Sequence, residues 1–230
     1  MQEETPHILG KFQEALDTIS ADLNTMADQV IANLEMAVRG LTERDSTLCD
    51  KVIAEDAEVD HLEMKIDEEG LRIMTLYQPV ATDLRKVISI MKVCGNLERV
   101  GDQAVSIARR ARKMNRNLEI AETRLVEPIY KRAIGLLQKS VTSFAAGNLK
   151  HALEIRAEDA ELNEAQKSVS KKLTSRMEND GDRIKDYLDL HFIVRWLERV
   201  GDHAKNIAEE AVFVTAAMDI RHGADRPEIQ

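Results

Sequence analysis

The hexapeptide Leu97-Glu98-Arg99-Val100-Gly101-Asp102 occurs twice in the chain, and its second copy, Leu197-Glu198-Arg199-Val200-Gly201-Asp202, is identical. A second motif, Ala54-Glu55-Asp56-Ala57-Glu58, returns 103 residues later as Ala157-Glu158-Asp159-Ala160-Glu161. A repeat of this length is one group of secondary-structure elements copied along the chain. The duplication therefore predicts a fold built twice from the same pattern.

Apolar residues surround both hexapeptides at the alternating three- and four-residue spacing of a helix that buries one face. In the first copy they are Ile90, Val93, Leu97, Val100, Ala104, Ile107 and Ala111, and in the second Leu190, Ile193, Leu197, Val200, Ala204, Ile207 and Ala211. The same spacing elsewhere predicts six helices: roughly 35 residues that include 12–41, then 48–76, 83–114, 127–146, 149–178 and 184–219. Thr82 is the expected N-cap of the third helix.

Each unit of the repeat contains three predicted helices, so we expect an all-α protein of two tandem three-helix bundles. The expected first bundle is 1–114, the linker 115–126, the second bundle 127–219 and the tail 220–230. One six-helix domain is the alternative, because 230 residues are enough to bury either kind of core.

Composition narrows the function classes. Asp and Glu number 41 against 32 Lys and Arg, a net charge of −9 with no basic run, which argues against nucleic-acid binding. No stretch approaches 18 apolar residues, and the N-terminus lacks a signal-peptide pattern. Two cysteines, Cys49 and Cys94, do not form a disulfide framework. We expect a reduced, cytoplasmic protein without membrane insertion.

The two acids of each hexapeptide are predicted to point away from the core. At 100° per residue, Glu98 and Asp102 lie about 130–170° from the centre of the apolar stripe. Two carboxylates four residues apart repel each other. One hypothesis is ordinary surface ion pairs, with Arg99, Arg199 and Arg195 as partners. The other is a cation site, because both outward acids are unchanged between the copies and hard cations take several carboxylate oxygens.

The second predicted helix offers further acids for such a site. They form a column of Asp56, Asp60, Glu63 and Asp67 that flanks the core stripe. In the second unit the aligned residues are Asp159, Asn163, Gln166 and Ser170, so only one acid remains. We therefore expect any second cation site to be weaker or different.

Other candidate features are weaker. Gly101 and Gly201 in mid-helix are interpreted as positions that allow close helix packing. Glu58-x-x-His61 matches one element of di-iron bundles but has no counterpart in the second unit. His191 and His203 are expected to be surface residues. Phosphate-binding glycine loops, nucleophile elbows and Cys-x-x-Cys pairs are missing from the sequence, which leaves enzymatic chemistry little support.

The doubled hexapeptide, together with Asp83-Leu84-Arg85 and Asn206-Ile207-Ala208-Glu209, resembles the PhoU family of bacterial phosphate-transport regulators over roughly residues 10–222. The resemblance implies tandem three-helix bundles that often dimerise. It also implies a negative regulator of the phosphate-starvation response and a modulator of phosphate uptake, acting as an adaptor between the ATPase subunit of the phosphate ABC transporter and a sensor histidine kinase. Such a protein is cytoplasmic and reaches the inner membrane only through its partners.

The resemblance further implies metal ions, such as Fe, Zn, Mg or Mn, bound at surface carboxylates and not needed for catalysis. The implied ligands are Glu98, Asp102, Glu198 and Asp202, with contributions from Asp56, Asp60 and Asp159; Asn163 departs from the pattern. Arg99 and Arg199 are the expected motif residues of a partner surface. Two other function classes stay open at this point: a metal-dependent carboxylate enzyme and a purely structural helical protein.

Overall fold

The computed structural model describes residues 8–221, which form six long α-helices and, within that range, no strand. The first three helices are α1 (Ile8–Thr42), α2 (Ser46–Tyr77) and α3 (Ala81–Met114). A short 3₁₀ turn, η1 (Ala121–Leu125), leads to α4 (Val126–Ala146) and α5 (Leu149–Asn179). A second turn, η2 (Gly181–Arg183), precedes α6 (Ile184–Ala216). The predicted all-α fold is confirmed.

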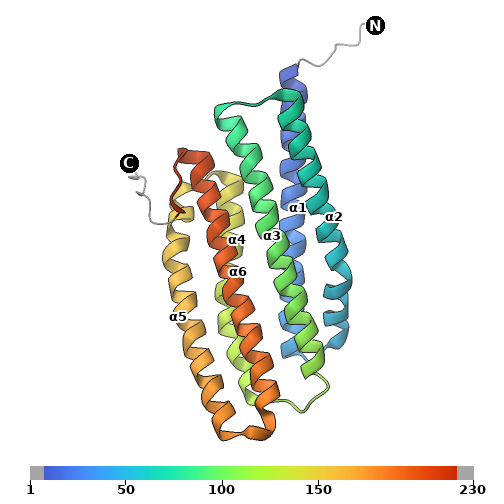
Figure 1. Ribbon diagram of the computed structural model, residues 1–230, viewed down its shortest axis with the longest axis vertical. Helices are drawn as coiled ribbons and strands as arrows, with labels where there is room; N and C mark the ends of the chain where they lie inside the picture. Colours follow the sequence, from blue (N-terminus) through green and yellow to red (C-terminus); the bar gives the residue numbers. More distant parts are fainter. Residues whose placement is uncertain (1–7, 222–230) are drawn as a thin grey trace.

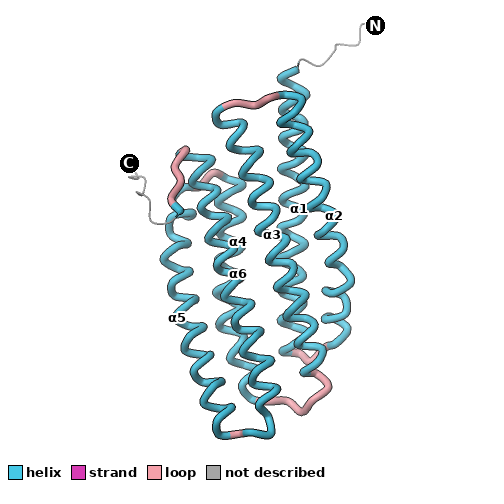
Figure 2. The backbone as a smooth tube through the Cα atoms, in the orientation of Figure 1, coloured by secondary structure: helices cyan, strands magenta, loops and turns pink. Residues whose placement is uncertain are grey.

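The helices form two three-helix bundles that lie side by side (Figure 1). Helices α1, α2 and α3 pack together, as do α4, α5 and α6, and α3 packs against α6 where the bundles meet. The loops lie at the two ends of the long bundles, so the long faces consist of helix alone (Figure 2). Helices α3 and α6 pack against each other and join the two bundles. The division into separate domains at 1–114 and 127–219 therefore stays a prediction.

Local sequence explains several helix ends. The Asp45 carboxylate accepts hydrogen bonds from the backbone N–H groups of Thr47 and Leu48, which caps the start of α2. Gly147 ends α4 with a φ of +63°, a left-handed conformation that favours glycine, and Asn148 caps α5. The prediction for Thr82 was wrong: the N-cap of α3 is Val80, which makes no side-chain capping bond.

The predicted core stripes are confirmed. All fourteen stripe residues of α3 and α6 are at most 1 % exposed. Cys49 and Cys94 are buried free thiols, and burial is the main cause that raises the pKa of Cys94 to about 12. No helix of the described residues is both long and apolar enough to cross a membrane.

Polar groups fix how the two bundles meet. Asp189 of α6 is buried and pairs with Arg110 and Lys113 of α3. At the other end of the joint, the buried Glu210 of α6 pairs with Lys92 of α3 at 3.1 Å. Buried carboxylates with partners on the opposite helix favour one register, since a shift would leave them unpaired.

The two histidines of α6 do not lie where the sequence suggested. His203 is only partly exposed, because it lies where the two bundles meet. Its Nδ1 is 3.0 Å from Asn96 Oδ1 of α3. Burial is the main cause that lowers the pKa of His203, followed by the positive charge of Arg99. His191 is also partly buried, and its Nδ1 has no hydrogen-bond partner. The prediction of two plain surface residues was wrong.

Candidate functional site

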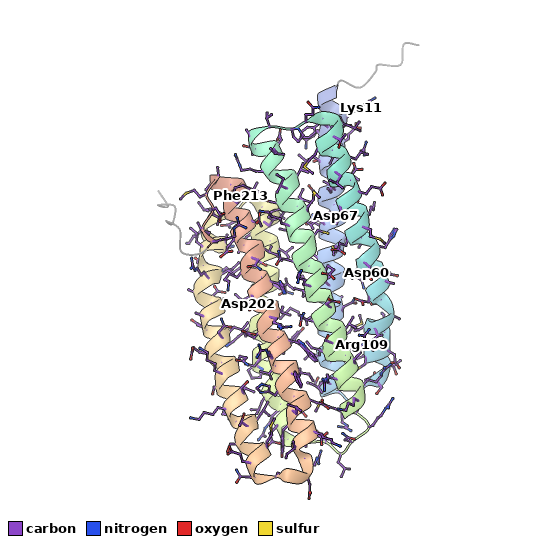
Figure 3. The ribbon with its side chains drawn as sticks, in the orientation of Figure 1. Lys11, Asp60, Asp67, Arg109, Asp202 and Phe213 are labelled. Carbon is purple, nitrogen blue, oxygen red and sulfur yellow. The ribbon has the colours of Figure 1, made fainter. Side chains whose placement is uncertain are left out.

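The acids of the first bundle gather where α2 lies against α3. We define the first patch as Asp56, Asp60, Glu63 and Asp67 of α2 with Glu98 and Asp102 of α3. Figure 3 shows Asp60 and Asp67 along α2, in the orientation of Figure 1. The side chains of Asp60, Asp67 and Asp102 are exposed, and those of Asp56, Glu63 and Glu98 are half-buried. The predicted outward direction of the hexapeptide acids is thus confirmed in this bundle.

The six acids of the first patch share a strongly negative environment. Burial raises the pKa of Glu98, and the charges of Asp102 and Glu63 raise it further. The pKa of Glu63 is raised by burial and then by Asp67 and Asp60. Burial also raises the pKa of Asp56, with Asp60 and Asp102 adding to the effect. Carboxylates of α2 and of α3 therefore repel one another in the first patch.

Basic residues lie near the first patch but do not pair with it: the charge of Arg99 lowers the pKa values of Glu98 and Glu63, and that of Arg109 lowers the pKa of Asp56, without offsetting the overall rise. Within residues 8–221, none of its six carboxylates takes part in an ion pair. Arg99, the partner that the surface hypothesis expected for Asp102, is exposed and unpaired in the same range. The first patch is a set of acids without a partner cation.

The second patch has a different composition. It consists of the aligned residues Asp159, Asn163, Gln166 and Ser170 of α5 with Glu198 and Asp202 of α6. Its centre is an ammonium group: Lys205 Nζ lies 3.2 Å from Asp159 Oδ2 and 3.1 Å from Asp202 Oδ1. The amide groups of this patch pair locally, since Gln166 donates to Ser170 at 2.9 Å.

The carboxylate that Lys205 contacts in the second patch is more buried than its counterpart in the first. Asp159 is only 4 % exposed, against a half-buried Asp56 at the aligned position. Burial lowers the pKa of Lys205, but its hydrogen bonds to Asp202 and Asp159 and their charges outweigh this, so the pKa is raised overall. Burial and Asp202 raise the pKa of Glu198, while Arg195 acts in the opposite direction. The expected Arg195–Glu198 and Arg199–Asp202 ion pairs do not form within the described residues.

The two glycines of the hexapeptides lie beneath these patches and allow close packing, as the sequence suggested. A Cβ on Gly101 would lie 3.4 Å from Val59 Cγ1, an ordinary contact. A Cβ on Gly201 would collide with Leu162 Cδ2 and lie 3.2 Å from Asp159 Oδ1. The side chain of Leu162, which is longer than the aligned Val59, therefore fills the space beside Gly201 more tightly than Val59 fills the space beside Gly101.

The two patches differ in how well they suit a metal ion. Within residues 8–221, no three Asp, Glu, His or Cys side chains converge as metal ligands would. The first patch nevertheless has the hard oxygen donors that Mg²⁺, Mn²⁺ or Ca²⁺ prefer, and no lysine among them. In the second patch a lysine ammonium already lies between two of the expected ligands. The residues of the first patch fit a cation by their chemistry, and those of the second do not.

Sequence reasoning missed Lys205. A signal existed, because Lys205 follows Asp202 by three residues, a spacing that brings side chains together on one helix face. The first unit has Val105 at the matching position. Only the packing of α5 against α6 reveals that Asp159 is the second partner. Glu58 and His61, the weak di-iron candidates, are both exposed.

A duplicated pair of three-helix bundles with carboxylate patches on the long faces defines a class of helical repeat proteins with surface sites. Comparison with known families places this chain more narrowly: the PhoU domain matches residues 23–111 and again 127–211. The chain belongs to the PhoU family. The two matched segments contain the two copies of the hexapeptide.

Individual relatives agree with the family. The chain is 33 % identical over 219 residues to a phosphate-specific transport system accessory protein PhoU homolog from Pseudomonas aeruginosa, covering 95 % of this chain and 90 % of that one. It is 32 % identical over 216 residues to the Escherichia coli protein PhoU, with 94 % and 90 % covered. The crystal structure of PhoU from Pseudomonas aeruginosa superposes with a TM-score of 0.88, over 90 % of this chain and all of that one, at 32 % identity.

Proposed function

We propose that this protein is a regulatory accessory protein of a phosphate-specific transport system. The observation that carries the proposal is its membership of the PhoU family, with relatives named as accessory proteins of such systems aligned over 95 % of its length. The duplicated patches on the bundle surface suit a protein that acts by contact. We propose no catalytic activity.

The regulatory role has a direction and two partners. The protein represses the phosphate-starvation response when phosphate is plentiful, and it links the transporter's ATPase subunit to a sensor histidine kinase in the cytoplasm. Arg99 and Arg199 support a partner surface, because both are exposed and neither has an ion-pair partner within residues 8–221. A guanidinium without a partner can bind a carboxylate of another protein through two hydrogen bonds. A homodimer is the proposed assembly.

Cation binding is the second part of the proposal, and it belongs to the first patch. Glu98 and Asp102, with Asp56 and Asp60 across from them on α2, would supply carboxylate oxygens. Burial is the main cause that raises the pKa values of Glu98 and Asp56, and a bound divalent ion would offset the repulsion between acids that adds to it. Its role would be to draw α2 and α3 together at the surface and to present charge to a partner.

The test of the regulatory role uses the native host. Transcripts of phosphate-scavenging genes are measured in phosphate-rich medium with and without this gene. Strong derepression on deletion is the expected result, and unchanged low transcripts would refute the role. Cross-linking in phosphate-replete cells should recover the transporter ATPase and the kinase; recovery of neither would contradict the adaptor mechanism.

A further inference from the structure

Lys205 occupies the place in the second patch where a cation would have to bind. Its Nζ atom lies within 3.2 Å of oxygens from two helices, Asp159 Oδ2 on α5 and Asp202 Oδ1 on α6. An added metal ion would need those oxygens at about 2.0–2.6 Å. It would also be repelled by the ammonium charge. Metal binding and the lysine contacts therefore exclude each other.

The burial of Asp159 explains why a cation of some kind is needed. The residue is 4 % exposed, and its Oδ1 atom has no hydrogen-bond partner at all. A buried carboxylate is costly unless a charge or several donors compensate it. Lys205 is the one cation within ion-pair distance of Asp159 among residues 8–221. The lysine is thus part of the fold as well as of the surface.

The surroundings of Asp159 would admit an ion from solvent. A cavity of about 360 Å³ opens beside it, and Asn163, Glu209 and Lys205 line this cavity with Asp159, together with two further basic residues, Arg156 and Arg221. Asn163 Oδ1 is a second buried oxygen without a hydrogen-bond partner. Oxygen donors and a route to solvent are therefore present. Of the three basic residues that line the cavity, Lys205 is the one that pairs with Asp159 and Asp202 within residues 8–221.

We infer that Lys205 is the built-in cation of the second patch: its ammonium replaces a divalent metal ion between Asp159 and Asp202, and this patch takes such an ion only when the lysine is removed. The first unit has Val105 at the same position, so the first patch keeps its acids free. The inference rests on the proposed cation binding, according to which the carboxylate patches attract divalent ions.

The experiment counts Mn²⁺ ions bound to the purified full-length protein by electron paramagnetic resonance. Lys205→Val, which installs the residue of the first unit, should bind at least one more Mn²⁺ per chain than the unchanged protein. Adding Asp202→Asn should abolish the gain. Lys167→Val is the matched control, because Lys167 is an exposed lysine of α5 paired with Glu164, and its Mn²⁺ count should stay unchanged.

Melting temperature supplies the second readout. Lys205→Val should melt several degrees lower than the unchanged protein in metal-free buffer, and saturating Mn²⁺ should restore most of the loss. Lys205→Gln serves the same purpose if the valine variant does not fold. An Mn²⁺ count equal to that of the unchanged protein, in a variant with full helicity, would overturn the inference. So would loss of bound Mn²⁺ on making Asp159→Asn in the unchanged background.

The failure of this inference is separable from the failure of first-patch binding. The count is repeated with Glu98→Gln and Asp102→Asn present, which removes two acids from the first patch. The gain from Lys205→Val should persist there. If the unchanged protein binds no Mn²⁺ but Lys205→Val does, first-patch binding is refuted and the inference stands.

Discussion

The two patches occupy matching places in the two bundles and satisfy their charges in opposite ways. The first contains six carboxylates without an ion pair in the described residues, and their mutual repulsion helps to raise the pKa values of Asp56, Glu63 and Glu98. The second contains three carboxylates, and Lys205 pairs with two of them. The same hexapeptide can thus be part of an open cation-attracting surface or of a closed ionic contact.

The difference shows which residues decide whether the carboxylates of a patch are paired with a cation. Glu98, Gly101 and Asp102 are unchanged in the second copy, so the hexapeptide alone cannot set the charge state of the patch. The deciding positions are Val105 against Lys205 and the column on the neighbouring helix. Duplication preserved the packing motif, while its neighbours diverged.

The largest expected effect comes from the aligned acids Asp159 and Asp56. Asp159→Ala should cost about 2 kcal/mol of unfolding free energy, because it breaks a nearly buried ion pair and leaves Lys205 with Asp202 alone. Asp56→Ala should change stability by less than about 0.5 kcal/mol, since it removes an acid that its neighbours repel. Urea unfolding at pH 7 measures both. Equal losses of unfolding free energy in the two variants would contradict the difference between the two patches.

The next largest difference in stability is expected between alanine substitutions at the two hexapeptide glycines. Gly201→Ala should lose about 1 kcal/mol, because the clash with Leu162 outweighs the better helix propensity of alanine. Gly101→Ala should be neutral or gain up to about 1 kcal/mol, since its Cβ meets only ordinary contacts. Gly95→Ala is the control for propensity alone, because its Cβ would meet nothing within 4 Å. A Gly201→Ala variant as stable as Gly101→Ala would contradict the tight contact of Leu162 with Gly201.

A smaller effect should depend on pH. The pKa of Glu98 is raised, so the folded state binds its proton more tightly than the unfolded chain does, and stability falls as pH rises through that pKa. Glu98→Gln should therefore stabilise by a few tenths of a kcal/mol at pH 7, and the gain should vanish near pH 4. Thermal unfolding from pH 4 to 8 measures it. A gain that grew toward low pH would contradict the raised pKa of Glu98, which burial and then the neighbouring acids cause.

The smallest effects belong to the outer acids of the hexapeptides. Asp102→Ala should shift stability by less than about 0.5 kcal/mol, because Asp102 is exposed and forms no ion pair within residues 8–221. Asp202→Ala should also cost less than about 0.5 kcal/mol, since the ion pair with Lys205 that it ends is partly exposed. Circular dichroism should show full helicity in both, and lost helicity would mean that these acids support the core.

Much of this fold could be predicted from local patterns. The stripe through Leu97 and Val100 follows from helical periodicity, which also places Glu98 and Asp102 on the outer side. The α3–α6 joint could not be predicted in this way. His203 contacts Asn96 of α3, and Lys205 pairs with Asp159 of α5, so both contacts depend on packing between helices that are distant in sequence. Periodicity says which face is buried but not which helix covers it.

The central claim is that the first patch is the working surface and the second is closed by Lys205. The most direct measurement is the transcript level of phosphate-scavenging genes in a deletion strain that carries variants of this protein, grown in phosphate-rich medium. Neutralising Asp56, Asp60, Glu98 and Asp102 to Asn or Gln should derepress those genes, with the variant protein present at normal levels. Neutralising Glu198 and Asp202 should leave them repressed. Repression kept by the first variant and lost by the second would contradict the account.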